Sequence, residues 1–374
     1  MDARCRSSNL TSRVQIVEYE VDTWYSGPYP EEYVKDDKIL LICEFCLSYM
    51  LDEECLRKHN NKCQHFCPPA DEIYRSLHKV KNFDEPQSLS VFEVDGAKSK
   101  LYCQNLCFLG KLFIDQKTLC YDVDQFLFYV LTRNDEVGSH LLGYFSKEKH
   151  SKYKYNVSCI MILPQYQSYG YGRFLIEFSY LLSKQENQLG SPEKPLSALG
   201  LNSYMNYWKY SIIDVIKDKD KISIKEISDA TNMTIEDVVC TLQDTHLVRK
   251  AAKSDNRGNQ YSILLMEHEI DKLNRPRLTV NPEDLRWTRY VSLYAKNSED
   301  DDDYAVSSTV HLSNDEAVVE NNNEPMQNGD DAAFDDEDNL SLKSHTSEAT
   351  EIAAGSPQGC LPMLEPMSSC VDGY

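Results

Sequence analysis

The 374-residue sequence lacks several features that would assign it to common classes of protein. It has no run of about 18 apolar residues, and its N-terminus, MDARCRSSNLTSRV, has no apolar core of the kind found in signal peptides. It shows no internal repeat, and its 13 cysteines follow no regular pairing pattern. These absences argue against a membrane-spanning or secreted protein. We therefore expect a soluble intracellular protein with reduced thiols, in which clustered cysteines bind a metal.

Basic residues are fewer than acidic ones, with 39 Lys and Arg against 60 Asp and Glu, and the formal net charge is −21. Residues 298–374 account for about −18 of this charge, because they contain about 19 acidic residues and one basic residue, Lys343. The rest of the chain is close to neutral. A segment with so few large apolar side chains cannot bury enough surface to offset its ordering entropy. We predict a disordered acidic tail over 298–374 and a disordered N-terminus over 1–13.

Residues 156–180, NVSCIMILPQYQSYGYGRFLIEFSY, combine three elements in order. The apolar run 157–163 ends at Pro164 and predicts a buried strand. A glycine-bearing loop follows over 167–172, and apolar residues at helical spacing then predict an amphipathic helix. The loop amides and the helix N-terminus could together cradle an anion. A tight strand-to-helix turn explains the same spacing, so the pattern alone leaves both readings open.

Four potential metal ligands occur in LLICEFCLSYMLDEECLRKHNNKC, namely Cys43, Cys46, His59 and Cys63. Their spacing supplies two ligands from a tight knuckle and two from one helix, as tetrahedral zinc requires. Cys55, His65 and Cys67 are off this register and are expected to be bystanders. The acidic run 52–54 near the start of the predicted helix would repel a nucleic-acid duplex. We therefore predict a structural C2HC zinc finger and no sequence-specific DNA binding.

The Gln-x-x-Gly-x-Gly loop between strand and helix resembles the acetyl-CoA pyrophosphate loop of GNAT-related acetyltransferases. NVSCIMILPQYQ at 156–167, together with GSPEKPLS at 190–197, resembles the MYST family of histone acetyltransferases, and the likeness covers about residues 14 to 287. Within that family, EYEVDTWYSGPYPEEY at 18–33 is similar to the males-absent-on-the-first subgroup. The resemblance implies an α+β fold with a GNAT-related core, an N-terminal zinc-finger lobe and a helix-turn-helix-like C-terminal lobe.

The expected domains follow from this likeness and from the composition. They are an N-terminal lobe at 14–75 with the zinc finger at 43–63, an acetyl-CoA-binding catalytic core at 76–210 and a C-terminal lobe at 211–290. In the C-terminal lobe, Ser223 with Glu226 and Thr234 with Asp237 match capping boxes that open short helices. We favour a structural role over nucleic-acid binding for this lobe, because its second helix opens with Glu236 and Asp237.

The resemblance also implies roles for individual residues. Glu193 corresponds to the general base that deprotonates the substrate lysine. Cys159 corresponds to an active-site cysteine that either accepts the acetyl group or only shapes the pocket; we favour direct attack by the amine within a ternary complex. Lys117 corresponds to a lysine that becomes autoacetylated. The implied acetyl-CoA contacts are Ile160, Met161, Ile162, Gln167, Ser168, Tyr169, Gly170, Tyr171, Gly172, Arg173 and Ser197.

Several positions depart from the family pattern. Ser168 stands where a basic residue is usual, Asn206 replaces a serine, Ala198 an aspartate and Cys120 a tyrosine. Loss of a basic residue beside a pyrophosphate weakens affinity, by up to a few kcal/mol where the site is buried. A catalytically weak scaffold subunit of a chromatin complex is therefore one alternative function. A zinc-finger nucleic-acid binder is another.

The leading interpretation is a nuclear enzyme that transfers acetyl from acetyl-CoA to histone tails, H4 in particular, in chromatin and transcription regulation. The predicted catalytic domain begins close to the start of the sequence and leaves no room for an upstream chromatin-reading module. Targeting is then expected from partner subunits of a chromatin-modifying complex, or from the acidic tail.

Overall fold

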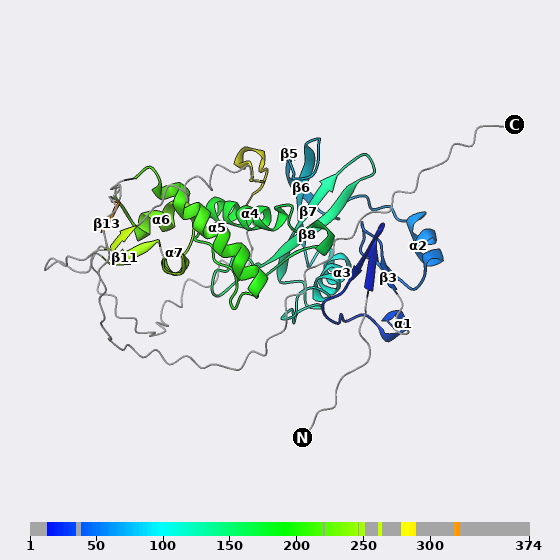
Figure 1. Ribbon diagram of the computed structural model, residues 1–374. Helices are drawn as coiled ribbons and strands as arrows, with labels where there is room; N and C mark the ends of the chain where they lie inside the picture. The colour runs from blue at the N-terminus through cyan, green and yellow to red at the C-terminus, as the bar shows by residue number, and fades with distance from the viewer. Residues whose placement is uncertain are drawn as a thin grey trace, which may run out of the picture. The chain divides into compact units, whose positions relative to one another are not determined.

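A computed structural model of the chain describes residues 13–34, 39–219, 221–245, 247–250, 261–263, 278–288 and 318–321 (Figure 1). The chain divides into two compact units, Met1–Glu324 and Pro325–Tyr374, and all described residues belong to the first. Within the described residues, no helix is both long and apolar enough to span a bilayer. The mixture of helix and sheet confirms the predicted α+β class.

The centre of the first unit is an antiparallel five-stranded sheet. In spatial and chain order it consists of β5 (Asp71–His78), β6 (Gln87–Asp95), β7 (Phe126–Asn134), β8 (Ser139–Glu148) and β9 (Cys159–Ile162). Side chains alternate between its faces, as β7 shows: Phe128 and Val130 join one core, whereas Leu127 and Tyr129 join another. Because both faces are covered, β7 reads as a continuous apolar run rather than as an alternating one.

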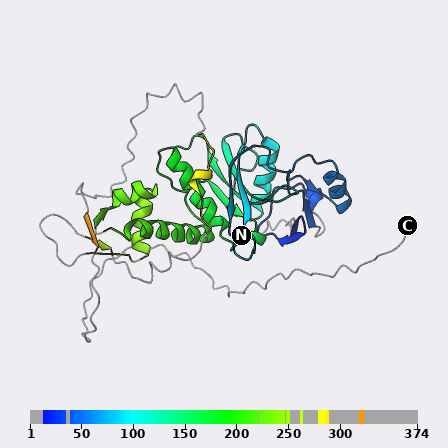
Figure 2. The ribbon, with the colours of Figure 1, turned by 90° about the horizontal axis from the view of Figure 1, so that it is seen from above.

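Two helices cover the two faces of this sheet. Helix α3 (Lys100–Lys111) contributes Leu106 and Leu109 to the first core. Helix α4 (Tyr171–Gln185) contributes Phe174 and Phe178 to the second. Figure 2 shows α3 and α4 on opposite sides of the sheet. The 3₁₀ turn η1 (Pro164–Tyr166) links β9 to α4, so the predicted strand–loop–helix order is confirmed.

The N-terminal lobe is built on a second sheet, in the order β2-β1-β3-β4. Its strands are β1 (Arg13–Ile16), β2 (Tyr19–Asp22), β3 (Ile39–Ile42) and β4 (Tyr49–Met50), and its helices are α1 (Glu31–Val34) and α2 (Glu53–Asn60). Val14, Leu40 and Ile42 belong to the same buried cluster as α3. The lobe is therefore continuous with one face of the central sheet.

The C-terminal lobe packs three helices against α4 around a third core. They are α5 (Ala198–Ile216), α6 (Ile224–Thr231) and α7 (Ile235–Asp244). Trp208 of α5 donates a buried 2.7 Å hydrogen bond to the hydroxyl of Tyr180 in α4. The remaining elements are β10 (Lys221–Ser223), β11 (Val248–Lys250), β12 (Tyr261–Ile263), β13 (Val318–Asn321) and the 3₁₀ turn η2 (Pro282–Asp284).

Of the two predicted capping boxes, the one at α6 is complete and the one at α7 is not. Ser223 and Glu226 form a complete capping box, in which each side chain bonds the backbone of the other. Thr234 caps α7 by accepting from the amide of Asp237, but the carboxylate of Asp237 bonds elsewhere, so the second predicted box is only half formed.

Strand β13 lies inside the range 298–374 for which the sequence predicts disorder. It pairs with β10 and β12 in a sheet of order β10-β13-β12-β11. The composition of that range does not anticipate this strand. Of the predicted disordered N-terminus, Arg13 is the first residue of β1, and residues 1–12 lie outside the described residues, as do the other residues of the tail.

His140 connects the N-terminal lobe to the central sheet. Its Nδ1 lies 2.6 Å from the carboxylate of Glu44, which follows β3, and its Nε2 lies 2.9 Å from that of Asp135, in the β7–β8 turn. Burial lowers the pKa of His140, but the hydrogen bonds to Glu44 and Asp135 outweigh burial and the pKa is raised. The imidazolium is therefore the form that holds these two elements together.

We predict that His140→Gln destabilises the protein by about 1–2 kcal/mol at mildly acidic pH, because it removes charge-assisted hydrogen bonds. A histidine whose pKa is raised on folding contributes its full stability below its unfolded pKa of about 6.5 and loses it as pH rises through the folded pKa. Thermal unfolding from mildly acidic to alkaline pH should show the difference from wild type shrinking as pH rises. The matched control is His150→Gln, at an exposed histidine. A penalty that does not change with pH would contradict the prediction.

Candidate functional site

The four predicted metal ligands meet in one cluster. The ligand atoms of Cys43, Cys46, His59 and Cys63 all lie within 4.8 Å of one another. The Sγ atoms of Cys43 and Cys63 are 4.0 Å apart, and Sγ of Cys46 is 3.2 Å from Nε2 of His59. Ligand atoms on a tetrahedral zinc with Zn–S of about 2.3 Å are separated by roughly 3.5–3.8 Å. The donor set and its spacing therefore fit zinc.

Local structure explains why these ligands converge. The amide of Leu47 donates to the carbonyl of Cys43, which closes the knuckle after β3. Asp52 caps α2 by accepting from the amide of Cys55, and α2 carries His59 in its last turn. The cluster, searched within the described part of the chain, does not include Cys55, His65 or Cys67. The acidic residues at the start of α2 are exposed, as the sequence indicates.

The predicted anion loop lies where β9 gives way to α4. Gly170 is the N-cap of α4 with φ of +100°, a conformation that favours glycine, and no side chain caps this helix end. The first amides of a helix have no intrahelical partner, so those at the start of α4 are available to an anion. A Cβ on Gly172 would meet only Ile162 Cγ1, at 3.8 Å, so the space beside this residue is open.

The side chains of the loop bond or pack against other parts of the protein, with the exception of the exposed Ser168. Gln167 donates to the carbonyl of Ile162 at 3.1 Å and ties the loop to the strand. Ser168 is exposed and has φ of +68°. Tyr171 is buried in the second core, and Tyr169 packs 6.1 Å from the ring of Phe83.

Arg173 is engaged inside the protein. Its guanidinium lies 3.0 Å from the carboxylate of Glu177 and 4.6 Å from the ring centre of Tyr210. The same group reaches the carbonyl of Leu278 at 3.4 Å. The structure thus places this cation against its own helix and the C-terminal residues. The implied contact of Arg173 with acetyl-CoA stays a prediction.

Strand β9 is the last strand of the described central sheet, so one edge is open. Leu163 donates to Leu142 on the β8 side, and by alternation the amide of Met161 also faces β8. The amides of Ile160 and Ile162 then face the open edge. Among the implied acetyl-CoA contacts Ile160, Met161 and Ile162, the amides of Ile160 and Ile162 are therefore the two not directed at β8.

The loop that carries Glu193 lies beside the start of β9. Val157 and Pro192 form a parallel bridge, and the amide of Glu193 donates to the carbonyl of Val157 at 2.8 Å. The amide of Asn156 donates to the carbonyl of Ser191 at 3.0 Å. The structure therefore brings Glu193, whose side chain is exposed, next to the residues that lead into Cys159.

Lys117 is buried beside Cys159, with its Nζ 3.8 Å from Sγ. Burial favours the neutral amine of Lys117, whereas the nearby hydroxyl of Tyr144 and the thiols of Cys159 and Cys107 favour the ammonium. The second effect is larger and raises the pKa of Lys117. Cys120, at the position where the family has a tyrosine, also belongs to this surrounding and is buried.

Two further predicted positions lie on α5 and are exposed. Ser197 is the N-cap of this helix and accepts from the amide of Gly200. Asn206 donates to the side chain of Asn202, one turn earlier. Both hydrogen bonds are made within α5 or at its start, and neither involves the glycine loop.

Sequence reasoning missed two features of this region. Gln165, in η1, has both side-chain amide atoms buried without a partner among the described residues, which is typical of a group that meets a ligand. Lys194 forms a 2.8 Å ion pair with Asp237, which is buried although the sequence suggests an exposed helix start. The burial of Asp237 depends on packing between distant segments, and no local pattern signals it.

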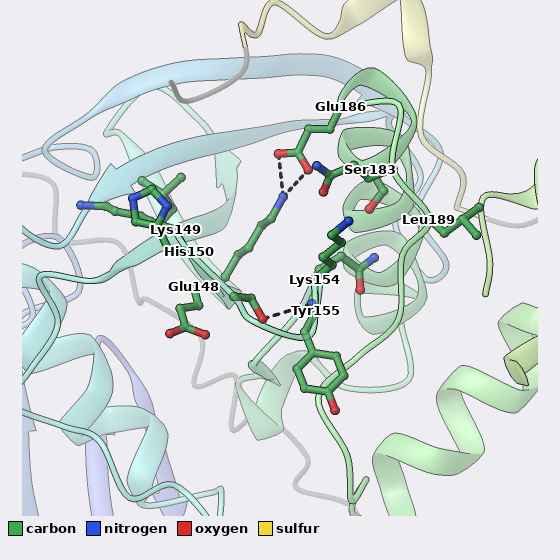
Figure 3. A pocket seen from close by; sticks show the side chains of 13 residues that line it. Glu148, Lys149, His150, Lys154, Tyr155, Ser183, Glu186 and Leu189 are labelled. Atoms are coloured by element: carbon green, nitrogen blue, oxygen red, sulfur yellow. Dashed lines mark hydrogen bonds and ion pairs between the residues drawn. The ribbon is translucent and has the colours of Figure 1, made fainter. Parts of the chain in front are cut away.

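A pocket of about 240 Å³ opens at the C-terminal end of α4 (Figure 3). It is lined mainly by the β8–β9 connection and by the residues that follow α4. Within it, Lys147 and Glu186 form a 2.6 Å ion pair. None of the predicted catalytic or acetyl-CoA-binding residues lines this pocket. Asn156, whose amide bonds the loop of Glu193, is one of its lining residues. It is therefore separate from the candidate active site.

The structure combines a zinc-type ligand cluster with a strand–loop–helix unit on the central sheet, and family models match both regions. The model of the MOZ/SAS family matches residues 67–285, and that of the MYST family zinc finger domain matches residues 9–63. The first match covers more than half of the chain. The chain therefore belongs to the MOZ/SAS family of the MYST group.

Named relatives support this assignment. The chain is 52% identical over 288 residues to "Histone acetyltransferase KAT6A" of Homo sapiens, which covers 75% of this chain and 14% of the relative. It is 51% identical over 298 residues to KAT6B of Homo sapiens, with 78% and 14% covered. It is 48% identical over 282 residues to "Histone acetyltransferase of the MYST family 1" of Arabidopsis thaliana, with 74% and 60% covered.

The chain thus spans about one seventh of the length of these KAT6 relatives and 60% of the Arabidopsis protein. The names of these relatives give no support to the narrower likeness to the males-absent-on-the-first subgroup.

We predict that Cys46→Ser abolishes stoichiometric zinc binding, because a tetrahedral site loses one of its four ligands. Structural zinc supplies on the order of 10 kcal/mol to the folding of small zinc domains, so residues 39–63 should become sensitive to protease. Metal analysis and limited proteolysis of the purified protein measure both effects. Cys55→Ser, at an exposed cysteine of the same lobe, is the matched control. Full zinc content in Cys46→Ser would show that the cluster is not the metal site.

Proposed function

We propose that this chain is a histone lysine acetyltransferase domain that uses acetyl-CoA. One observation carries the proposal: the base loop and the anion loop lie at opposite ends of the same short strand. Glu193 is bonded beside Val157, just before β9, and α4 begins soon after β9 ends. A coenzyme lying along the open edge of β9 would have its diphosphate at α4 and its acyl end near Glu193. The family and the names of its relatives support the same activity.

In the proposed reaction, the carboxylate of Glu193 accepts a proton from the ammonium of the substrate lysine. The free amine attacks the thioester carbonyl, an amide bond forms, and coenzyme A leaves as the thiol. The amides of Ile160 and Ile162 are the donors available to the carbonyl oxygen as it gains negative charge. Binding of the diphosphate depends on the amides at Gly170 to Arg173.

The proposal for Cys159 starts from its contacts. Its amide donates to the hydroxyl of Ser146, which holds it at the start of β9. We favour direct attack by the substrate amine, with Cys159 shaping the pocket. Lys117, 3.8 Å from its sulfur, is the proposed site of autoacetylation.

The substrate and setting are narrower proposals. Histone H4 is implied by the subgroup likeness, whereas the KAT6 names leave the histone open, so both H3 and H4 peptides belong in the assay. A histone substrate supports nuclear localisation, and we further propose membership of a chromatin-modifying complex. Imaging of the tagged chain and mass spectrometry of the proteins bound to it test these two points.

A catalytically weak scaffold is the second candidate, because Ser168 is uncharged and the guanidinium of Arg173 is engaged with Glu177. Nucleic-acid binding is less favoured, since exposed acidic residues open α2 and the exposed Glu236 opens α7. Binding of DNA by a protein that transfers no acetyl group would favour the nucleic-acid-binding function.

We predict that Gly172→Ala lowers affinity for acetyl-CoA by at least about tenfold, because a methyl group would fill the space that the diphosphate needs. The protein itself has room for this methyl group. Alanine is also a better helix former than glycine by up to about 1 kcal/mol, so the melting temperature should be equal or higher. Calorimetric titration with acetyl-CoA and thermal unfolding measure the two effects separately. Unchanged affinity would place the coenzyme elsewhere.

We predict that Glu193→Gln lowers kcat with histone peptides by about 10²-fold or more, the usual contribution of a general base. Acetyl-CoA affinity should be retained, because the base is remote from the anion loop. Cys159→Ala is the comparison: full loss of activity, together with a trapped acetyl group on Cys159, would replace direct attack by a covalent route. Mass spectrometry of the same reactions shows whether Lys117 is acetylated. Equal rates for wild type and Glu193→Gln would remove Glu193 as the base.

A further inference from the structure

The loop that carries Glu193 is anchored on two sides. On one side it bonds the segment before β9, through Asn156 with Ser191 and through Val157 with Glu193. On the other side it meets the C-terminal lobe. The amide of Gly190 donates to the carbonyl of Asn232 at 2.7 Å, and Gly190 forms a parallel bridge with Met233.

The second contact with the C-terminal lobe comes directly after Glu193. Nζ of Lys194 lies 2.8 Å from Oδ1 of Asp237, in the first turn of α7. The two lobe contacts therefore enclose the loop at residues 190 and 194, three residues before the proposed base and one after it. Glu193 itself has an exposed side chain, so these flanking contacts restrict its backbone.

Burial of Asp237 makes this ion pair strongly asymmetric. The side chain of Asp237 is 2% exposed, whereas that of Lys194 is 46% exposed. Oδ2 of Asp237 has no hydrogen-bond partner among the described residues, so Lys194 is the principal group that compensates the buried carboxylate. A buried charge that loses its partner is strongly destabilising. Lys194 is thus held in place by the carboxylate, not by its own surroundings.

We propose that Asp237 is a positioning residue for the acetyl transfer: by holding Lys194 it fixes the backbone on which Glu193 stands. The inference rests on the proposed function of Glu193 as the base. It also gives the C-terminal lobe a role in catalysis, because residues 232–237 supply both contacts on that side of the loop. Misplacement of a catalytic group by about 1 Å can cost up to 10²-fold in rate.

The informative substitution is Asp237→Asn, which keeps the shape of the side chain and removes its charge. Because Lys194 is half exposed, its ammonium can then turn to water, and the fold should be retained. We expect kcat to fall at least about tenfold while KM for acetyl-CoA changes less than about twofold, since the anion loop lies at the far end of β9. Hydrogen exchange at the amides of Ser191, Glu193 and Lys194 should become faster.

Three further variants complete the experiment. Asp214→Asn is the matched control, because it breaks an exposed 2.7 Å pair with Lys217 in the same lobe, away from the loop. Lys194→Arg keeps the ion pair and should keep most of kcat. Lys194→Met removes the pair and should lower kcat as Asp237→Asn does; if it fails to fold, the arginine variant still tests the pair.

The outcomes separate this inference from the proposed function. A wild-type protein without acetyl transfer contradicts the proposed function, and hydrogen exchange at the amides of Ser191, Glu193 and Lys194 then tests the anchoring alone. An active wild type with unchanged kcat and exchange in folded Asp237→Asn overturns the inference. So does an equal loss in Asp214→Asn, or a loss in Lys194→Arg as large as in Lys194→Met.

Discussion

The main-chain bonding around β9 is the constraint on which the rest of this structure depends. On one edge β9 is paired with β8, and its opposite edge is open along the residues expected to face the coenzyme. The segment before it holds the loop of Glu193, and the turn after it leads into α4. Because these are backbone contacts, they specify positions without relying on long, mobile side chains. The positions of the proposed active-site residues are therefore defined mainly by backbone geometry.

Packing then supports this strand from both faces. Met161 enters the core shared with α3 and the N-terminal lobe, whereas Ile162 enters the core shared with α4. Successive residues of one strand thus connect two separate cores. The zinc cluster stabilises the lobe that lies beyond the first of these cores, so the metal supports the site from a distance and needs no catalytic role.

The features that could be predicted from the sequence are those whose interacting residues lie close together along the chain. The zinc ligands lie within 21 residues of one another, and knuckle and helix spacing define them locally. The strand, the glycine loop and α4 are also consecutive, so pattern and resemblance located them. By contrast, the partners of Arg173 and the burial of Asp237 depend on contacts made by distant segments. An aspartate that opens a helix suggests exposure to solvent, but tertiary packing buries Asp237. An arginine beside a glycine loop suggests an anion ligand, and no local pattern shows that Arg173 also contacts Glu177 and Leu278.

The anion loop has a consequence for how a ligand reaches it. Within the loop, Ser168 carries no charge and the charge of Arg173 is matched by Glu177, so attraction comes from aligned peptide dipoles. Dipole fields decline with distance more steeply than the field of a net charge, and they act within the first turn of the helix. The groups of the loop itself therefore guide an anion only weakly from afar, and longer-range attraction depends on cations outside the loop, such as Arg133, whose charge acts on Tyr171 at the start of α4.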